Sequence, residues 1–272
     1  MSNRPTPTVL TIAGFDPYGG AGVGLDSKVI HALGGYAYRL ITAMTAQNSL
    51  GVVEVTPIPL ATFEKQLHTL LTDVKVDALK IGMLATKEMV EVVANAIVSY
   101  KIQTVVLDTI LVSSSGKLLL EEDAIKVMVN KLFPLVTLIT PNIPETNRLL
   151  GASYRGEASE IEAMAQGLFA LGANSILIKG GHSPNTTYAI DYLIDAKETK
   201  EAFSSKRIET THTHGTGCFL SSAIATELAK GNPLPLAIKK AKRFLFTSMK
   251  EATKTLNLSY HQVSKKRREP LL

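Results

Sequence analysis

The sequence is poor in cysteine and in long apolar runs. Cys218 is the only cysteine among 272 residues, so no disulfide can form within the chain. This usage fits a reducing compartment. No apolar stretch approaches the roughly 20 residues that span a bilayer. The early apolar run at 9–13 is too short for a signal peptide and meets Gly14 and Asp16 at once. We therefore expect a soluble, cytoplasmic protein without a membrane partner.

Most of the chain also carries little net charge, because the positive excess is concentrated near the C-terminus. The formal net charge is +5. Lys265, Lys266, Arg267 and Arg268, less Glu269, contribute +3 of it, which leaves +2 for the rest. A short basic end without interleaved aromatic residues is typical of a solvated terminus, and nothing else favours nucleic-acid binding. We expect no nucleic-acid partner.

The composition favours one large globular domain. Hydrophobic residues make up 45% and charged residues 19% of the chain, which allows a sizeable core. No internal repeat or convincing linker divides it. The prediction is a single domain over 1–272, with its core at about 8–254 and a basic tail at 255–272.

Short apolar runs alternate with longer amphipathic segments. Buried strands are predicted at 8–13, 78–82, 104–108, 136–140 and 175–179. Helical spacing covers 25–33, 61–71, 87–100, 121–132, 159–171, 217–230 and 234–253. Segments 37–47 and 52–57 suit strands at an edge or flap, and 188–205 suits a hairpin. Apolar strands separated by helices predict an α/β fold, a mostly parallel sheet with helices on both faces.

Polar residues follow several of these strands. They are Asp16, Asp108, Asn142 with Glu145, and Lys179. Ligands of such sheets bind beyond the carboxyl ends of the strands, so these side chains should converge on one edge.

The most distinctive segment runs from His212 to Cys218 and leads into an apolar helix. Gly215, Thr216 and Gly217 form a turn that brings N–H groups together at a helix N-terminus, a site for negative charge. The helix field there favours the thiolate of Cys218, which suits a general base or nucleophile. The alternative is an ordinary glycine turn. A metal site at His212 and His214 is disfavoured, because no further ligand lies nearby in sequence.

Asn142 and Glu145 share the first turn of a predicted helix. Alone, this spacing favours a capping box. Together with Asp108, Lys179 and the later turn, it suits a Mg²⁺ ion held partly through water.

Two further glycine-containing segments are less specific. Lys179 precedes a Gly-Gly pair and suits phosphate contact or ordinary turn chemistry. The loop at 16–24 fits neither standard nucleotide fingerprint, so close approach to a small substrate is the better interpretation. Asp26 follows it and either caps a helix or touches that substrate.

Taken together, seven segments resemble the hydroxymethylpyrimidine/phosphomethylpyrimidine kinase family, within the ribokinase-like superfamily. They are LTIAGFDPYGGAG at 10–22, ITAMTAQN at 41–48, KIGML at 80–84, VVLDT at 105–109, TPNIPE at 140–145, IKGGH at 178–182 and HTHGTGC at 212–218. They stand in family order and the resemblance spans about 8–250.

The resemblance implies ATP-dependent phosphorylation of a hydroxymethylpyrimidine and then of its monophosphate, in thiamine biosynthesis. It also implies a homodimer. Gln47 would bind the aminopyrimidine edge, and four residues would shape the pocket: Ala21, Asp26, Met83 and Ile110. Nucleotide phosphates and Mg²⁺ would fall to Asp108, Asn142, Glu145, Lys179 and Thr216, with Asp108 and Glu145 toward the metal. Cys218 would take the place of the superfamily's aspartate base, beside Gly215 and Gly217.

Three residues depart from the family's usual pattern: Phe15, Tyr18 and Ser114. They affect the expected substrate preference more than the reaction. A pyridoxal kinase on the same scaffold is the nearest alternative. A non-catalytic pyrimidine sensor is the alternative from another class. Whether the loop at 182–187 closes as a lid stays open.

Overall fold

The structure is a computed structural model and describes residues 5–48, 51–112, 119–196, 199–210 and 213–252. Its strands are β1 (Thr8–Phe15), β2 (Tyr36–Asn48), β3 (Gly51–Pro57), β4 (Ala78–Ile81), β5 (Val105–Leu107), β6 (Leu138–Ile139), β7 (Ser175–Ile178), β8 (Tyr188–Asp195) and β9 (Lys200–Lys206). Its α-helices are α1 (Gly22–Ala32), α2 (Leu60–Asp73), α3 (Lys87–Ser99), α4 (Glu122–Lys131), α5 (Ile143–Leu150), α6 (Ile161–Ala170), α7 (Thr216–Ala229) and α8 (Leu234–Ala252). Ser114, His212 and the basic tail at 255–272 lie outside the described residues.

These strands form one sheet in the order β3-β2-β1-β4-β5-β6-β7-β8-β9. The six strands from β2 to β7 in that order are parallel. The antiparallel strands lie at the edges, with β3 beside β2 and the β8–β9 hairpin beside β7. The predicted α/β class, the edge strands and the hairpin are confirmed.

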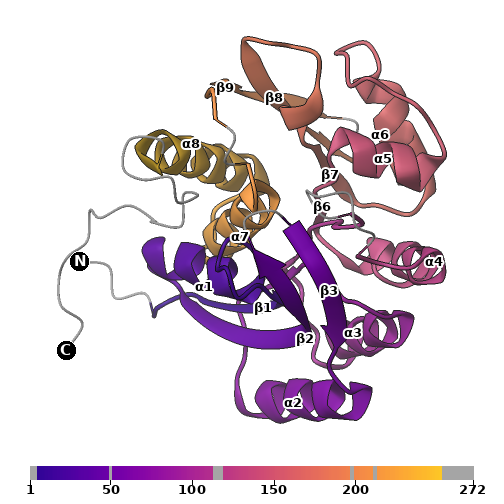
Figure 1. The fold of residues 1–272 in the computed structure, drawn as a ribbon, viewed down its shortest axis with the longest axis vertical. Coiled ribbons are helices and arrows are strands. Elements are labelled where there is room, and N and C mark those ends of the chain that lie inside the picture. The colour runs from indigo at the N-terminus through magenta and orange to yellow at the C-terminus, as the bar shows by residue number, and fades with distance from the viewer. Residues whose placement is uncertain (1–4, 49–50, 113–118, 197–198, 211–212, 253–272) are drawn as a thin grey trace.

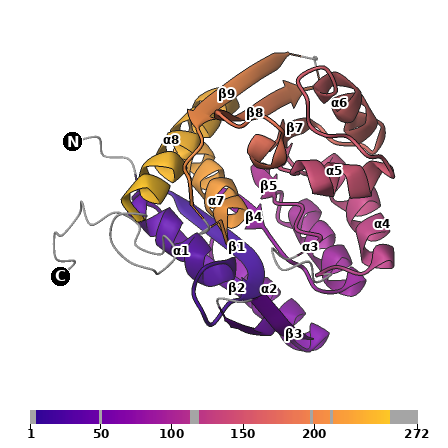
Figure 2. The same ribbon diagram turned by 45° about the horizontal axis from the view of Figure 1, so that its top comes forward.

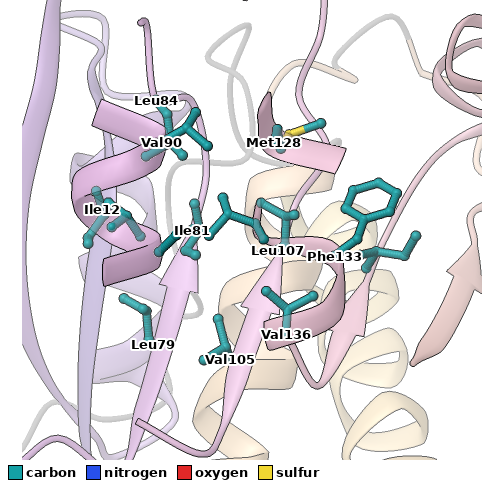
Figure 3. Packing of buried hydrophobic residues seen from close by; sticks show 14 of the residues in the cluster. Ile12, Leu79, Ile81, Leu84, Val90, Val105, Leu107, Met128, Phe133 and Val136 are labelled. Atoms are coloured by element: carbon teal, nitrogen blue, oxygen red, sulfur yellow. The ribbon is translucent and has the colours of Figure 1, made fainter. Parts of the chain in front are cut away.

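Helices cover both faces of the sheet (Figures 1 and 2). Side chains of one strand alternate between the faces, so each strand contributes to two cores. In β1, Leu10 and Ile12 pack with the core on the α2–α6 side, whereas Val9 packs with the core under α1, α7 and α8. Figure 3 shows the first core, in which Ile81 and Leu107 lie on neighbouring strands and Phe133 belongs to the same cluster.

Several predicted element ends differ from the structure by one to three residues, and two of these differences have a clear physical cause. The strand predicted at 136–140 is reduced to Leu138–Ile139, because a 3₁₀ turn (Phe133–Leu135) precedes it and Pro141, which has no N–H, follows Thr140. The first helix begins at Gly22 rather than at 25. Gly22 has φ +57° and lies so close to the Gly14 carbonyl that a Cβ there would stand 2.1 Å from its oxygen.

Within the described residues, none of the helices combines the length and apolar character needed to cross a bilayer.

Candidate active site

A cavity of about 390 Å³ opens beyond the carboxyl ends of the parallel strands. Every residue predicted for the site lines it, except Asp26. These residues are Ala21, Gln47, Met83, Asp108, Ile110, Asn142, Glu145, Lys179, Gly215, Thr216, Gly217 and Cys218. The predicted convergence at one sheet edge is therefore confirmed as a spatial arrangement.

The glycine turn brings the N-terminus of α7 against the charged groups of this cavity. Gly215 has φ +78°, and a Cβ there would lie 1.8 Å from the Gly20 carbonyl oxygen. A Cβ on Gly217 would lie 3.3 Å from Lys179 Nζ and 3.5 Å from Asp108 Oδ2. The first N–H groups of a helix have no intrahelical acceptor. The turn thus offers donors for an anion next to a lysine.

Asp108 and Lys179 join the ends of β5 and β7. Lys179 Nζ lies 2.8 Å from Asp108 Oδ1. The hydroxyls of Thr140 and Ser221 donate to the two carboxylate oxygens at 3.1 and 3.2 Å. Burial opposes ionisation of Asp108, but the charges of Lys179 and Lys80 and the hydrogen bonds from Lys179 and Thr140 hold its pKa below the usual value. Burial likewise opposes the charge on Lys179, and Asp108 outweighs it, so the lysine pKa is raised.

Glu145 forms the capping box that its spacing with Asn142 predicts. The Asn142 side chain accepts the Glu145 N–H, and Glu145 Oε2 accepts the Asn142 N–H, both at 2.8 Å. Glu145 also lies 3.8 Å from Lys179 Nζ. Burial raises the pKa of Glu145 to about 7. Capping thus places this carboxyl group in the cavity, so the two interpretations of the pair are compatible.

The donor set suits a hard cation that brings other ligands with it. Of the three carboxylates that line the cavity, Asp108 and Glu145 lie together beside Lys179. Among the residues that the structure describes, no three His, Cys, Asp or Glu side chains are grouped to hold a metal. A Mg²⁺ ion here would keep waters or phosphate oxygens as its remaining ligands.

The Cys218 thiol does not behave as the helix position alone predicts. It is buried, and burial raises its pKa to about 11, with the nearby carboxylates of Asp26 and Asp108 acting in the same direction. Lys80 and the Gly22 N–H act the other way and are outweighed. The expectation of a favoured thiolate is wrong for the free protein, whose resting form is the thiol.

Asp26 does not line the cavity, so its predicted part in the pocket is not supported. Its carboxylate is fully buried and lies 2.9 Å from Lys80 Nζ. It also accepts hydrogen bonds from Thr11 and Ser222, at 2.5 and 2.8 Å. Asp26 therefore belongs to a buried network between β1, β4, α1 and α7. In the sequence, only Lys80 could have indicated this network, because it is a charged residue within an otherwise apolar strand.

Gln47 lies in a polar corner of the cavity together with His214 and Asp16, two residues that the sequence did not link to it. Its side-chain nitrogen lies 2.9 Å from Nε2 of His214, which lies 3.2 Å from Asp16 Oδ2. Of the two departures from the family pattern that are described, Phe15 lines the cavity. Tyr18 donates its backbone N–H to Asp16 at 2.8 Å.

A second cavity of about 400 Å³ adjoins the first and shares Lys179, Thr216 and Gly217 with it. Asp191 and Lys242, two residues that sequence reasoning missed, line it as an ion pair at 2.5 Å. Lys242 stands on the buried face of α8, where a lysine needs a partner. Its position in the helix could therefore have indicated a buried ion pair.

Arg207 holds the loop that follows Lys179. Its guanidinium donates to the carbonyl oxygens of Gly181 and Ser183, at 2.8 and 3.0 Å, and to that of Asn185. In this structure the segment at 182–187 is thus tied to the residue that follows β9.

The sheet, the glycine turn before α7 and the Asp108–Lys179 pair match a small-molecule kinase with a ribokinase-like fold. A family model described as phosphomethylpyrimidine kinase matches residues 16–263. The chain belongs to this phosphomethylpyrimidine kinase family.

Relatives and solved structures agree with this assignment. The hydroxymethylpyrimidine/phosphomethylpyrimidine kinase of Haemophilus influenzae is 42% identical over 247 residues, 90% of this chain and 91% of the relative. A phosphomethylpyrimidine kinase structure from Clostridium difficile 630 has a TM-score of 0.78 and 32% identity, covering 89% of this chain and 99% of its own. A Bacillus subtilis pyridoxal kinase in complex with ADP has a TM-score of 0.83 and 34% identity, covering 91% and 93%.

Proposed function

We propose that this protein transfers a phosphoryl group from ATP to the hydroxymethyl group of 4-amino-5-hydroxymethyl-2-methylpyrimidine, and a second one to the resulting monophosphate, in thiamine biosynthesis. The observation that carries the proposal is the continuous cavity, which joins Gln47 to the turn before α7 and to Lys179. Family membership and the relatives' names support this substrate.

The first cavity suits the pyrimidine, and the second suits the nucleotide. Gln47 presents an amide to the ring edge, and Ala21, Met83 and Ile110 shape the surrounding wall. Lys179 and Gly217 line both cavities, which supports phosphate binding at the boundary between them. The ADP complex of the related pyridoxal kinase supports nucleotide use.

The reaction is an in-line displacement at the terminal phosphorus of ATP. The substrate hydroxyl oxygen forms the new P–O bond while the bond to the β-phosphate oxygen breaks, releasing ADP. The N–H groups of the turn from Gly215 to Cys218 hold the transferring group, and Lys179 adds positive charge. Asp108 and Glu145, with Asn142 and Thr216 nearby, would hold Mg²⁺ and the phosphates. The ion would neutralise phosphate charge.

Cys218 accepts the proton of the substrate hydroxyl. With a pKa of about 11, only about one molecule in 10⁴ is a thiolate at pH 7, so the free protein is poorly prepared for this step. Binding therefore has to favour the thiolate, and positioning and electrostatics carry most of the catalysis. No covalent intermediate on Cys218 is involved.

We also propose a cytoplasmic homodimer built from a single ribokinase-like domain. A pyridoxal kinase and a non-catalytic sensor are less well supported. The Asp108–Lys179 pair, Glu145, and the turn before α7 together provide what phosphoryl transfer needs, which a sensor does not require.

The test is ATP turnover with Mg²⁺ and, separately, the hydroxymethylpyrimidine, its monophosphate, pyridoxal and ribose. Both pyrimidines should stimulate ADP release far more than pyridoxal or ribose. Preference for pyridoxal would overturn the proposed substrate. Ligand-dependent melting without turnover would favour a sensor.

A further inference from the structure

Arg148 is a second cation of the first cavity, in addition to Lys179. Among the described residues that line this cavity, no other lysine or arginine is present, whereas three carboxylates are. In the described part of the chain, the second cavity includes Lys179 but not Arg148. Arg148 is therefore placed for a ligand of the first cavity, the one proposed for the pyrimidine, rather than for the nucleotide.

The position of Arg148 on α5 brings it close to the lysine at the glycine turn. It follows Glu145 by three residues, so the two share a helix face, with their Cβ atoms about 5–6 Å apart. Glu145 lies 3.8 Å from Lys179 Nζ, and a Cβ on Gly217 would lie 3.3 Å from the same nitrogen. Arg148 thus stands one helical turn from a carboxylate that borders the proposed phosphate site.

Lys179 alone is poorly placed to balance a second phosphate in this cavity. Its Nζ lies 2.8 Å from Asp108 and 3.8 Å from Glu145, so its charge is shared between two carboxyl groups. The hydroxymethylpyrimidine is uncharged, whereas a phosphate monoester carries about 1.5–2 negative charges at pH 7. In the second phosphorylation this charge would stand beside the terminal phosphate of ATP. A further cation in the pyrimidine cavity offsets that repulsion.

The present partner of Arg148 is a weak competitor for a phosphate. One Nη of Arg148 donates to Glu122, at the start of α4. The Glu122 side chain is 66% exposed, and this described residue does not line the cavity, so water competes for the pair. A guanidinium has five N–H donors and can bind a phosphate through two of them at once. Arg148 can therefore exchange the Glu122 carboxylate for a phosphate.

We propose that Arg148 binds the phosphate of the pyrimidine monophosphate, exchanging Glu122 for it, and so favours the second phosphorylation over the first. Arg148 is then a specificity-determining residue, because it distinguishes the anionic substrate of the second step from the neutral substrate of the first. Until that phosphate is bound, Glu122 holds the guanidinium at the wall of the cavity.

This inference rests on the proposed function, and the experiment separates the two. Calorimetric Kd values are measured for the hydroxymethylpyrimidine, its monophosphate and ATP, each with the full-length protein. The wild type is compared with Arg148→Met, Arg148→Lys, Glu122→Gln and the control Arg155→Met. Arg155 is 73% exposed, pairs with Glu157 and, as a described residue, lines neither cavity. Turnover of the hydroxymethylpyrimidine by the wild type tests the proposed function, whereas the Kd values test Arg148 and need no turnover.

The two partners of the ion pair should have effects of opposite sign. Relative to the neutral pyrimidine, Arg148→Met should weaken binding of the monophosphate about ten- to a hundredfold, because a charged hydrogen-bond donor is lost. Arg148→Lys keeps the charge without the paired donors and should lose less. Glu122→Gln removes the competing carboxylate and should tighten monophosphate binding about two- to threefold. Arg155→Met should keep the wild-type ratio.

The inference is overturned if Arg148→Met leaves the ratio of the two pyrimidine Kd values unchanged. It is also overturned if Arg148→Met and Glu122→Gln both weaken monophosphate binding, as the loss of a purely structural link between α4 and α5 would. A larger loss for ATP than for the monophosphate would assign the guanidinium to the nucleotide and reject the proposal. Melting of each variant with ADP reports whether it folds. If Arg148→Met does not fold, Arg148→Lys and Glu122→Gln decide.

Discussion

Lys80 Nζ lies 2.9 Å from Asp26 Oδ2, and neither side chain has any exposed surface. The pair links β4 to α1 beneath the candidate active site. Two hydroxyls, from Thr11 and Ser222, bond the same carboxylate. The pair is tolerated at this depth because its two charges neutralise each other and the carboxylate accepts two further hydrogen bonds.

Removing one partner of this ion pair should lower the free energy of unfolding more than replacing both partners with apolar residues. Lys80→Met leaves Asp26 buried without its counter-charge and should lower the free energy of unfolding by about 3–5 kcal/mol. The double variant Lys80→Met/Asp26→Leu should lose less than Lys80→Met alone. Urea unfolding measures both. Lys126→Met is the control, since the Lys126–Asp123 pair is exposed and 3.8 Å long. A double variant that loses the sum of the two single losses would contradict the coupling.

Replacement of Cys218 tests its assignment as the base. Cys218→Ala should lower kcat about 10²–10⁴-fold, the usual contribution of a general base. Cys218→Ser keeps the side-chain size and controls for packing. Wild-type turnover by correctly folded Cys218→Ala would remove the assignment.

The pH dependence of turnover follows from the raised pKa of Cys218. Below a pKa of about 11 the thiolate fraction of the free enzyme rises tenfold per pH unit, so kcat/KM should rise between pH 7 and 9. Cys218→Asp carries a base that is already ionised, and its profile should be flat across that range. Equal slopes in the two proteins would show that another group titrates.

Mg²⁺ binding should depend on the protonation of Glu145. Its pKa of about 7 means that about half of the free protein carries this proton at pH 7, and a cation displaces it. In the presence of ADP, Mg²⁺ affinity should rise as pH increases from 6 to 8. Glu145→Gln should remove this dependence. Calorimetry in two buffers with different ionisation enthalpies counts the released protons, and release of none at pH 7 would contradict the prediction.

The same shift has a consequence for stability. Folding raises the Glu145 pKa from 4.5 to about 7, so the folded state binds the proton more tightly. The contribution of this proton to the free energy of unfolding is present in full below pH 4.5 and is lost as pH rises through 7. Relative to the wild type, Glu145→Gln should therefore be more stable at pH 8 than at pH 5.

Asp191 connects the second cavity to Lys179. It accepts the Gly180 N–H at 2.9 Å and pairs with Lys242. Asp191→Ala should free both and raise the KM for ATP about tenfold, while the Kd for the pyrimidine stays constant. Lys240→Met is the control, because Lys240 is half exposed and pairs with Glu227 on α7. Equal effects on both substrates would indicate general disruption instead.

Local patterns in the sequence predicted most of the fold. Apolar strands and amphipathic helices are short-range features, and the parallel sheet follows from their alternation. The carboxyl-end rule then placed Asp108 and Lys179 together, although they are 71 residues apart. Element ends were less predictable, as at Gly22, where a backbone contact with Gly14 decides where the helix begins.

Contacts across the chain and the effects of burial could not be predicted. His214 and Gln47 are 167 residues apart, and nothing in either segment indicates that they touch. Cys218 has the helix position that favours a thiolate, yet burial beside Asp26 and Asp108 reverses the effect. Local spacing does not report burial depth or the charges that the fold brings nearby.

The most direct measurement is phosphorus NMR of the products formed from the hydroxymethylpyrimidine with excess ATP and Mg²⁺. The account predicts a pyrimidine monophosphate that gives way to the diphosphate, with two ADP released per pyrimidine. A pyrimidine that stays unphosphorylated while pyridoxal is converted, or that binds without any ADP release, would contradict it.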